Sequence, residues 1–426
     1  MHDYLPDGEA FFGVAAESFL GSKNIRKADG TLFDDPFHPR SLWNFLKDGI
    51  GRTNLYNDLG CYIVLNDTGT SLVLENTYYD SATIELLNTH GLRIYYYETL
   101  LLDVLPKMRF SALLDTAQQY PQGFDNTKEN IKNMYCLEFE SVEIFIKNNN
   151  LTNVTFCTGE HNISKYLQHK YSFKIDDTKD VLLAHQLNDS IDSFGFDSKY
   201  KTYFSSNLIE HKFFSNNWRY AKHRKIICSD LITRNSLISW AFDDDLSDVN
   251  LPEPYMSRLI DGNKVLQSSV PLCIDIPFNK SSYTNSNEPD YFESKIIDPY
   301  ISPLPIDAYS KCFCAIINES EFYRPSVVVT EKIINAIKAG RPFVVAGTPY
   351  SLEYLHTLGF KTFDDYWDES YDTELNHNTR LTKILDIISV IDQYTIEELK
   401  ILYDRMLPAI EHNFNHLYYL RDNYVL

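Results

Sequence analysis

The sequence predicts an α/β protein made of two doubly wound domains, each a mostly parallel sheet with helices on both faces. Two observations lead to this fold class. Short apolar runs alternate with helix-like patterns in both halves of the chain, which is typical of parallel sheets covered by helices. The 426 residues also exceed what one ordinary core holds, so we expect two domains of about 200 residues each.

The first half alternates strand and helix patterns up to a polar, aromatic stretch near residues 190–222. Apolar runs predict strands at 61–66, 71–76, 92–98, 153–159 and 180–185. Helical spacing predicts helices at 80–91, 136–150 and 161–170, and Gly91 is the expected C-terminal cap of the first. The polar stretch marks the domain boundary, so we predict an N-terminal domain over 1–205.

The second half repeats the alternation. The patterns predict strands at 222–230, 264–277, 311–320 and 342–346, and helices at 233–246 and 330–339. These elements form a second domain over 206–395, followed by a helical tail over 396–426. In the tail, Thr395 and Glu398 form a capping box, and Pro408 is expected to kink or break the helix. A kinked tail of this length is expected to pack back on the first domain.

Charge and cysteine content narrow the class of protein. The net charge of −20, from 39 basic and 59 acidic residues, argues against a broad nucleic-acid-binding surface but leaves room for a local basic cleft. The seven cysteines are scattered without zinc-ligand spacing, which favours a reducing compartment. The acidic start "MHDYLPDGEAFF" lacks the pattern of a signal peptide, and no apolar run is long enough to span a membrane. We therefore expect a cytoplasmic protein.

The stretch "VVVTEKIINAIKAGRPFVVAG" (327–347) carries the clearest chemical signal. Its helix begins with Thr330, Glu331 and Lys332, and the preceding strand ends at Glu319 and Ser320. A right-handed strand–helix unit places both groups on the same rim of the sheet. Free N–H groups and the helix dipole favour an anion there, Lys332 adds a positive charge, and the two carboxylates can accept hydrogen bonds from sugar hydroxyls. The trio fits a nucleotide diphosphate joined to a sugar, although a plain helix cap has the same residues.

The longer stretch "INESEFYRPSVVVTEKIINAIKAGRPFVVAG" (317–347) resembles the donor-binding stretch of fucosyltransferase-like glycosyltransferases of the GT-B fold. The segment that follows, "LEYLHTLGFKTFDDYWDESYD" (352–372), resembles uncharacterised glycosyltransferase-like proteins of tailed phages. The similarity covers about residues 310–395. It implies a GT-B-like fold, in which two Rossmann-type domains face each other across a cleft.

The resemblance also implies roles for individual residues. Glu319 would contact the donor sugar or its ribose, and Glu331 and Lys332 would contact ribose and diphosphate, with Ser320 and Thr330 in the same motif. A basic segment, "RKIICSDLITRNSL", looks like the family's segment that supplies an arginine for the diphosphate. Arg234 stands where that arginine would be, and Arg224 and Lys225 are nearby alternatives. The donor would be a GDP- or UDP-sugar, with no cofactor required.

An inverting glycosyltransferase needs a base that takes a proton from the acceptor hydroxyl. Glu98, at the end of the 92–98 strand, is the preferred candidate, with Asp67 and Glu9 as lesser ones. Glu98 could instead serve as an ordinary helix-start acid, and a retaining mechanism needs no such base. Asp243-Asp244-Asp245 follows a predicted helix, so an acidic turn is favoured over a metal site, and the histidines show no ligand spacing.

The leading hypothesis is thus a hexosyl- or pentosyltransferase that acts on a hydroxyl acceptor. A glycan suits the fucosyltransferase resemblance. A hydroxymethylated base of phage DNA suits the phage-like segment, would need a basic cleft such as one lined by "RYAKHRK" (219–225), and would place the protein in the host cytoplasm. The alternatives are a nucleotide-sugar-binding protein without catalysis and a phage structural protein with a borrowed GT-B fold.

Overall fold

The structure is a computed structural model. It describes residues 19–22, 61–65, 74–96, 100, 102–103, 133–178, 183, 198–217, 220–240, 242, 246–247, 249–270, 272, 274 and 306–423.

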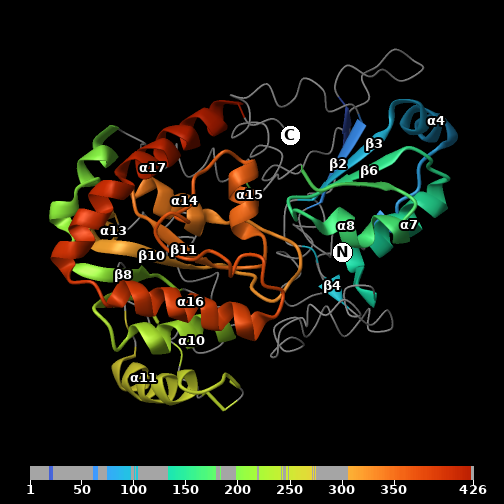
Figure 1. Cartoon of the computed structure of the whole chain (residues 1–426). Helices are drawn as coiled ribbons and strands as arrows, with labels where there is room; N and C mark the ends of the chain where they lie inside the picture. Colours follow the sequence, from blue (N-terminus) through green and yellow to red (C-terminus); the bar gives the residue numbers. More distant parts are fainter. Residues whose placement is uncertain are drawn as a thin grey trace.

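The described residues form a mixed α/β protein with two mostly parallel sheets (Figure 1). The first sheet has the strand order β1-β2-β3-β6-β7. Only β1 runs antiparallel to its neighbour. Its strands are β1 (Phe19–Ser22), β2 (Cys61–Leu65), β3 (Leu92–Tyr96), β6 (Val154–Cys157) and β7 (Lys174–Asp176). The prediction of a mixed α/β protein with parallel sheets is confirmed.

Helices pack on the first sheet where the sequence predicts them. They are α4 (Ser81–His90), α7 (Leu137–Asn149) and α8 (Ile163–Leu167), the last continued by the 3-10 turn η3 (Gln168–Lys170). Asp80 caps α4 by accepting a 2.7 Å hydrogen bond from the Thr83 N–H, and Gly91, at φ 80°, ends the helix as predicted. A short antiparallel pair, β4 (Leu102–Asp103) and β5 (Tyr135–Cys136), lies before α7.

Two predicted strands of the first half differ from the structure. In the 71–76 range, residues 74–76 form a helical end and a turn. In the 180–185 range the structure describes only Leu183, which has helical geometry and packs in the core of the second sheet. Conversely, β7 was not predicted, because its three residues alternate too briefly to give a strand pattern.

The second sheet is parallel throughout, with the strand order β11-β10-β8-β9. Its strands are β8 (His211–Ser215), β9 (Ser236–Ile238), β10 (Cys312–Asn318) and β11 (Phe343–Ala346). All seven residues of β10 are buried, as a central strand between two helical layers requires. The described residues form two main hydrophobic cores, one under each sheet, and Tyr323 packs against both.

Helices cover both faces of the second sheet: α14 and α17 lie on one side and α10 and α16 on the other (Figure 1). The longer helices are α10 (Lys222–Leu231), α11 (Tyr255–Ser269), α14 (Glu331–Lys338), α16 (His377–Asp392) and α17 (Ile396–Asn423). Shorter helical segments are η4 (Ser198–Tyr203), η5 (Ser206–Leu208), α13 (Ile306–Ser310) and α15 (Ser351–Thr357).

The segment 206–277 was largely predicted wrongly. The predicted strand 222–230 is helix α10, the predicted helix 233–246 contains strand β9, and the predicted strand 264–277 begins inside α11. β8 lies in the stretch taken as the domain boundary. The physical reason is clearest in α10, where every residue from His223 to Leu231 is buried. Because its polar residues are buried together with its apolar ones, α10 lacks the alternation of buried apolar and exposed polar faces that marks a helix in sequence, and its short apolar run looks like a strand.

The C-terminal helix begins as predicted. The Thr395 N–H and hydroxyl each donate a 2.8 Å hydrogen bond to Glu398, whose N–H donates back to the Thr395 hydroxyl at 3.3 Å. The helix is not broken at Pro408, which lies inside α17.

α17 lies against α14, η5, β8 and β10, around the second sheet. There, the Tyr403 hydroxyl donates to the Gly340 carbonyl at 2.8 Å. Within the predicted first domain α17 contacts Lys201, through a 3.1 Å hydrogen bond to Asn415, and Phe204, whose ring meets Phe414.

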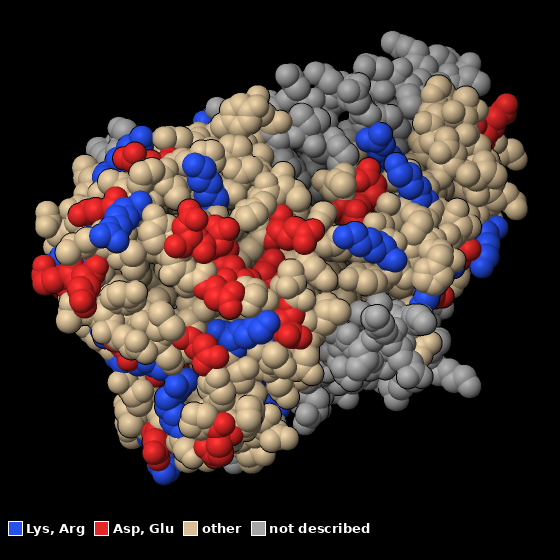
Figure 2. Space-filling view, in the orientation of Figure 1, with Lys and Arg blue, Asp and Glu red and all other residues tan. Residues whose placement is uncertain are grey.

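In the part of the chain that the structure describes, no helix combines the length and apolar character needed to cross a membrane. Acidic side chains gather over the half of the molecule that holds the second sheet, with basic ones scattered among them (Figure 2). The face in view is therefore unlike the broad basic surface of a general nucleic-acid-binding protein.

Candidate functional site

The candidate site lies at the carboxyl edge of the second sheet, where β10 ends and α14 begins. Glu319 directly follows β10, and its N–H donates a 3.0 Å hydrogen bond to the Ala346 carbonyl of β11. Thr330 is the N-cap of α14. A loop of residues 320–329 separates them along the chain, yet their side chains meet. In parallel α/β sheets, ligands bind at this edge.

A buried carboxylate holds the start of α14. Glu319 is 1% exposed, and its Oε2 accepts a 2.5 Å hydrogen bond from the Thr330 hydroxyl. The Thr330 and Ser320 N–H groups add bonds of 3.3 Å each. Burial raises the pKa of the Glu319 carboxyl, against the opposing pull of Lys332 and of the Thr330 hydrogen bonds. Glu319 therefore faces Thr330, and its direct contribution in this structure is to fix the N-terminus of α14.

Lys332 and Glu331 form the more accessible part of the site. The Lys332 ammonium lies 2.8 Å from a Glu331 carboxylate oxygen, 3.2 Å from the Thr330 hydroxyl and 3.4 Å from the Ser320 hydroxyl. The two side chains are 21% and 28% exposed. Burial alone would raise the pKa of Glu331, but the charge and hydrogen bond of Lys332, a backbone hydrogen bond and the charge of Arg224 together outweigh burial, and the pKa lies below its usual value. Five predicted residues (Glu319, Ser320, Thr330, Glu331 and Lys332) are thus brought together.

Two residues at the start of α10 complete the cluster. The Glu319 carbonyl accepts hydrogen bonds from Arg224 Nη2 at 3.0 Å and from His223 Nε2 at 3.1 Å. The His223 ring stacks on Phe322, with centroids 4.8 Å apart. Burial and the charge of Arg224, with smaller effects of Arg380 and Lys332, hold the pKa of His223 well below its usual value. His223 is therefore neutral, and its Nδ1 has no hydrogen-bond partner in the structure as described.

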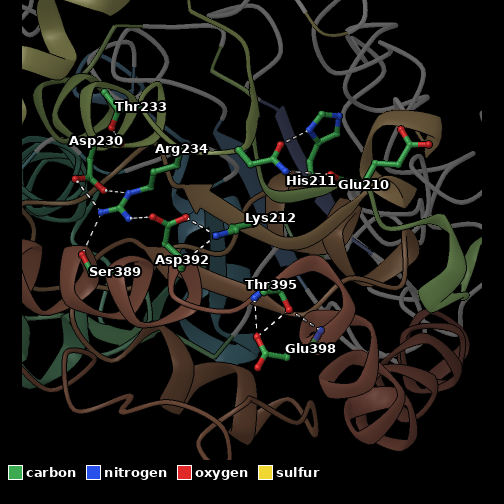
Figure 3. A network of polar contacts seen from close by, with 11 residues as sticks. Glu210, His211, Lys212, Asp230, Thr233, Arg234, Ser389, Asp392, Thr395 and Glu398 are labelled. Atoms are coloured by element: carbon green, nitrogen blue, oxygen red, sulfur yellow. Dashed lines mark hydrogen bonds and ion pairs between the residues drawn. The ribbon is translucent and has the colours of Figure 1, made fainter.

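Arg234 is not brought together with the other predicted site residues, which corrects its expected place beside them. It follows α10 and precedes β9, so it belongs to the amino edge of the sheet, opposite Glu319. Its guanidinium bonds to Asp230 at 2.9 Å and to Asp392 at 2.6 Å, and it also reaches Ser389 (Figure 3). The resemblance implies Arg234 because the family's segment is a strand followed by a helix, whereas residues 222–231 of this chain form helix α10. As a helix, this segment presents its first residues, including Arg224, to the site.

The other residues considered from the sequence either are described but do not face the site, or lie outside the described residues. Lys225 is fully buried on α10 and is not accessible to a ligand. His211 pairs with Asn235 at 2.6 Å, away from the site (Figure 3). Outside the described residues lie Glu98, Asp67, Glu9, Asp243-Asp244-Asp245, His185 and Arg219. Among the residues that the structure does describe, no three His, Cys, Asp or Glu side chains gather as a metal site would require.

A second buried carboxylate, Glu160, was missed by the sequence analysis. It follows β6 at the carboxyl edge of the first sheet and is 1% exposed. It accepts hydrogen bonds from the Leu100 N–H at 2.5 Å, from Arg324 Nη1 at 3.2 Å and, through a short contact, from the Ser326 hydroxyl. Burial raises its pKa to about 7, although the charge of Arg324 opposes the rise. Arg324 and Ser326 belong to the loop between β10 and α14.

The edges of the two sheets therefore meet through this loop. His161, next to Glu160, exchanges backbone hydrogen bonds with Val327 at 2.9 and 3.0 Å. The His161 ring also stacks on Tyr354 of α15, with centroids 4.5 Å apart. The only sequence feature that indicates Glu160 is its position after a strand, because no motif marks this residue.

A scan of protein-family models found no match to the chain, and no curated protein matches it significantly.

Proposed function

We propose that the chain is a glycosyltransferase that moves a sugar from a nucleotide-diphosphate sugar to a hydroxyl acceptor. The observation that carries this proposal is the group of positive charges at the carboxyl edge of the second sheet. Arg224, Arg380 and Lys332 each depress the pKa of His223, in a chain of net charge −20. A local concentration of cations beside a helix N-terminus in an acidic protein suits a polyanionic ligand.

The geometry supports a division of roles among the residues at this edge. The Lys332 ammonium and the positive end of the α14 dipole would hold the diphosphate, with Arg224 close behind, while the Thr330 and Lys332 N–H groups stay bonded to Glu319 and to the Thr330 hydroxyl. Glu331 is the accessible carboxylate and would accept hydrogen bonds from the ribose hydroxyls. Glu319 would hold Thr330 and the helix start in place, since its oxygens are already engaged. The roles of Glu331 and Lys332 agree with the resemblance of residues 317–347 to donor-binding stretches. The role of Glu319 differs from the donor contact that the resemblance implies, and Arg224 takes the place expected for Arg234.

In the proposed inverting reaction, a base accepts the proton of the acceptor hydroxyl while that oxygen attacks the anomeric carbon of the sugar. The bond from that carbon to the diphosphate oxygen breaks, and the nucleoside diphosphate leaves. Lys332 and the N-terminus of α14 would stabilise the negative charge that develops on the leaving oxygen. Glu98 stays the predicted base. Two parallel sheets with adjoining carboxyl edges are compatible with the GT-B arrangement, which remains part of the proposal.

A glycan is the acceptor that the observations favour. Acidic side chains dominate the second-domain half of the face in Figure 2, which would repel a DNA duplex laid across it. A hydroxymethylated base of phage DNA remains the other acceptor to test.

A thermal-shift screen with GDP, UDP, ADP and CMP and their sugar conjugates tests the donor site. A ligand at about 100 times its Kd stabilises the protein by about 2.7 kcal/mol. We expect one nucleotide to raise the Tm, and Lys332→Ala to abolish that rise. Lys400→Ala is the matched control, since Lys400 also pairs with a neighbouring glutamate, at 2.7 Å and 25% exposure, but on α17.

Three outcomes separate the hypotheses. Stabilisation followed by transfer of labelled sugar to a glycan or to hydroxymethylated DNA supports the transferase. Stabilisation without transfer to any acceptor supports a nucleotide-sugar-binding protein. If no nucleotide shifts the Tm of the wild-type protein, the donor-site hypothesis is rejected and a structural role is favoured.

A further inference from the structure

The loop from Glu319 to Thr330 makes contacts at two places, the candidate donor site and the first sheet. Its two ends form the candidate donor site, where the Glu319 carboxylate bonds to the Thr330 hydroxyl and N–H. Its middle contacts the first sheet, where Arg324 and Ser326 bond to Glu160 and Val327 pairs with His161. Only three residues, 327–329, separate Ser326 from Thr330, so a displacement of Ser326 is transmitted to Thr330 along a short stretch of chain.

The connecting stretch has little freedom to absorb such a shift. Val327 and Val329 are 0% and 1% exposed, and Ser326 is fully buried. Fully extended chain spans at most about 3.6 Å per residue, so Thr330 lies within roughly 14 Å of Ser326. Close-packed interiors transmit displacements of this kind because no empty space takes them up.

Glu160 is the central group of the contact with the first sheet. One carboxylate oxygen accepts from Leu100 and Arg324, and the other accepts from Ser326. Arg324 also donates to the Leu100 carbonyl and lies 2.9 Å from Glu321. Removing the carboxyl group therefore releases the loop at two residues and leaves Arg324 without its buried carboxyl partner.

We propose that Glu160, on the first sheet, is a positioning residue for the donor site on the second sheet, acting through Ser326 and Arg324 on the start of α14. An effect of Glu160 on catalysis rests on the proposed function. Its effect on the start of α14 does not depend on that function. Because coupling between two sites is reciprocal, a ligand at the donor site must also tighten the contact between Glu160 and the loop.

Amide hydrogen exchange on the ligand-free protein tests the effect on α14. In Glu160→Ala and in Ser326→Ala we expect the N–H groups of Thr330 and Lys332 to exchange about 3- to 10-fold faster than in wild type. Glu160→Gln should restore most of the protection, because its amide oxygen can accept from Leu100 and its NH₂ can donate to the Ser326 hydroxyl. Unchanged exchange at Thr330 and Lys332 in both alanine variants would overturn the proposal.

Glu138→Ala is the matched control for losing a buried carboxylate. Glu138 is fully buried on the first sheet's side and accepts from the Tyr96 hydroxyl at 3.0 Å and from Cys136 Sγ at 3.1 Å. We expect it to lower the Tm without changing exchange at Thr330 and Lys332. If Glu138→Ala accelerates exchange there as much as Glu160→Ala does, the effect is general loosening and the proposal is wrong. Ser326→Ala, a small change, keeps the test valid should Glu160→Ala fail to fold.

Calorimetric titration with GDP and UDP then separates this inference from the proposed function. If wild type binds neither nucleotide and the thermal-shift screen shows no shift, the proposed function fails, and the exchange experiment still decides the role of Glu160. If wild type binds one, we expect its Kd to rise about 3- to 10-fold in Ser326→Ala and to be unchanged in Glu138→Ala. The bound nucleotide should also slow exchange of the Leu100 and His161 N–H groups on the first sheet. Equal Kd values in wild type and Ser326→Ala contradict the inference.

Discussion

The Thr330 side chain shows how a single residue can serve local structure and a ligand site together. Its hydroxyl caps α14 by accepting from the Lys332 N–H at 3.4 Å, and it donates to the buried Glu319 carboxylate. A valine of the same shape keeps the packing but removes both bonds. The Glu319 oxygen then remains buried without its hydroxyl partner, which is costlier than the loss of an exposed cap.

We therefore expect Thr330→Val to lower the free energy of unfolding by about 1–3 kcal/mol. Thr330→Ser keeps the hydroxyl and should cost less than half as much. Urea denaturation measures both. For comparison, Thr395→Val removes the corresponding hydroxyl at the exposed capping box of α17 and should cost about 1 kcal/mol. Equal losses at the two positions would mean that the contact between Glu319 and Thr330 contributes nothing beyond an ordinary cap.

At the scale of elements, the sequence predicted helices and strands correctly where the apolar pattern and the capping residues indicated the same boundaries. The β10–α14–β11 unit was predicted because β10 is a continuous buried run and Thr330 and Gly340 mark the two ends of the helix. α10 was predicted wrongly because its polar and apolar residues are buried together. For the arginine, the resemblance favours Arg234, whereas the structure places the alternative, Arg224, beside Glu319. The roles of His223 and Glu160 could not be predicted, since both depend on contacts with residues far along the chain.

The corrected place of Arg234 leads to a test at this scale. Arg234 joins the end of α10 to α16, through the fully buried Asp230 and through Asp392 (Figure 3). Arg234→Met removes one partner of the buried Asp230 and should lower the free energy of unfolding by about 3 kcal/mol. The Kd for a nucleotide should stay unchanged in the folded protein. Arg224→Met, at the other end of α10, should instead weaken nucleotide binding, and the reverse pattern would restore Arg234 as the donor-site arginine.

At the scale of the whole molecule, the contact between the two sheets is expected to respond to pH. Glu160 is surrounded by the Arg324 guanidinium, the Glu321 carboxylate, the Ser326 hydroxyl and the Leu100 N–H, and its pKa is raised from 4.5 to about 7 by burial. Between these two values the folded protein holds a proton that the unfolded chain releases. The stability that Glu160 contributes is therefore present below about pH 4.5 and lost as the pH rises through about 7.

Comparison with Glu160→Gln isolates this contribution, because glutamine does not titrate and every other group is shared. We expect the free energy of unfolding of the variant, relative to wild type, to increase by about 3 kcal/mol between pH 4.5 and pH 8. Urea denaturation at intervals across this range measures the difference. A relative stability that stays flat would show that Glu160 titrates as an exposed glutamate does, and one that falls would show that Arg324 holds it ionised. In either case the buried carboxylate would not be the pH-dependent group at this junction.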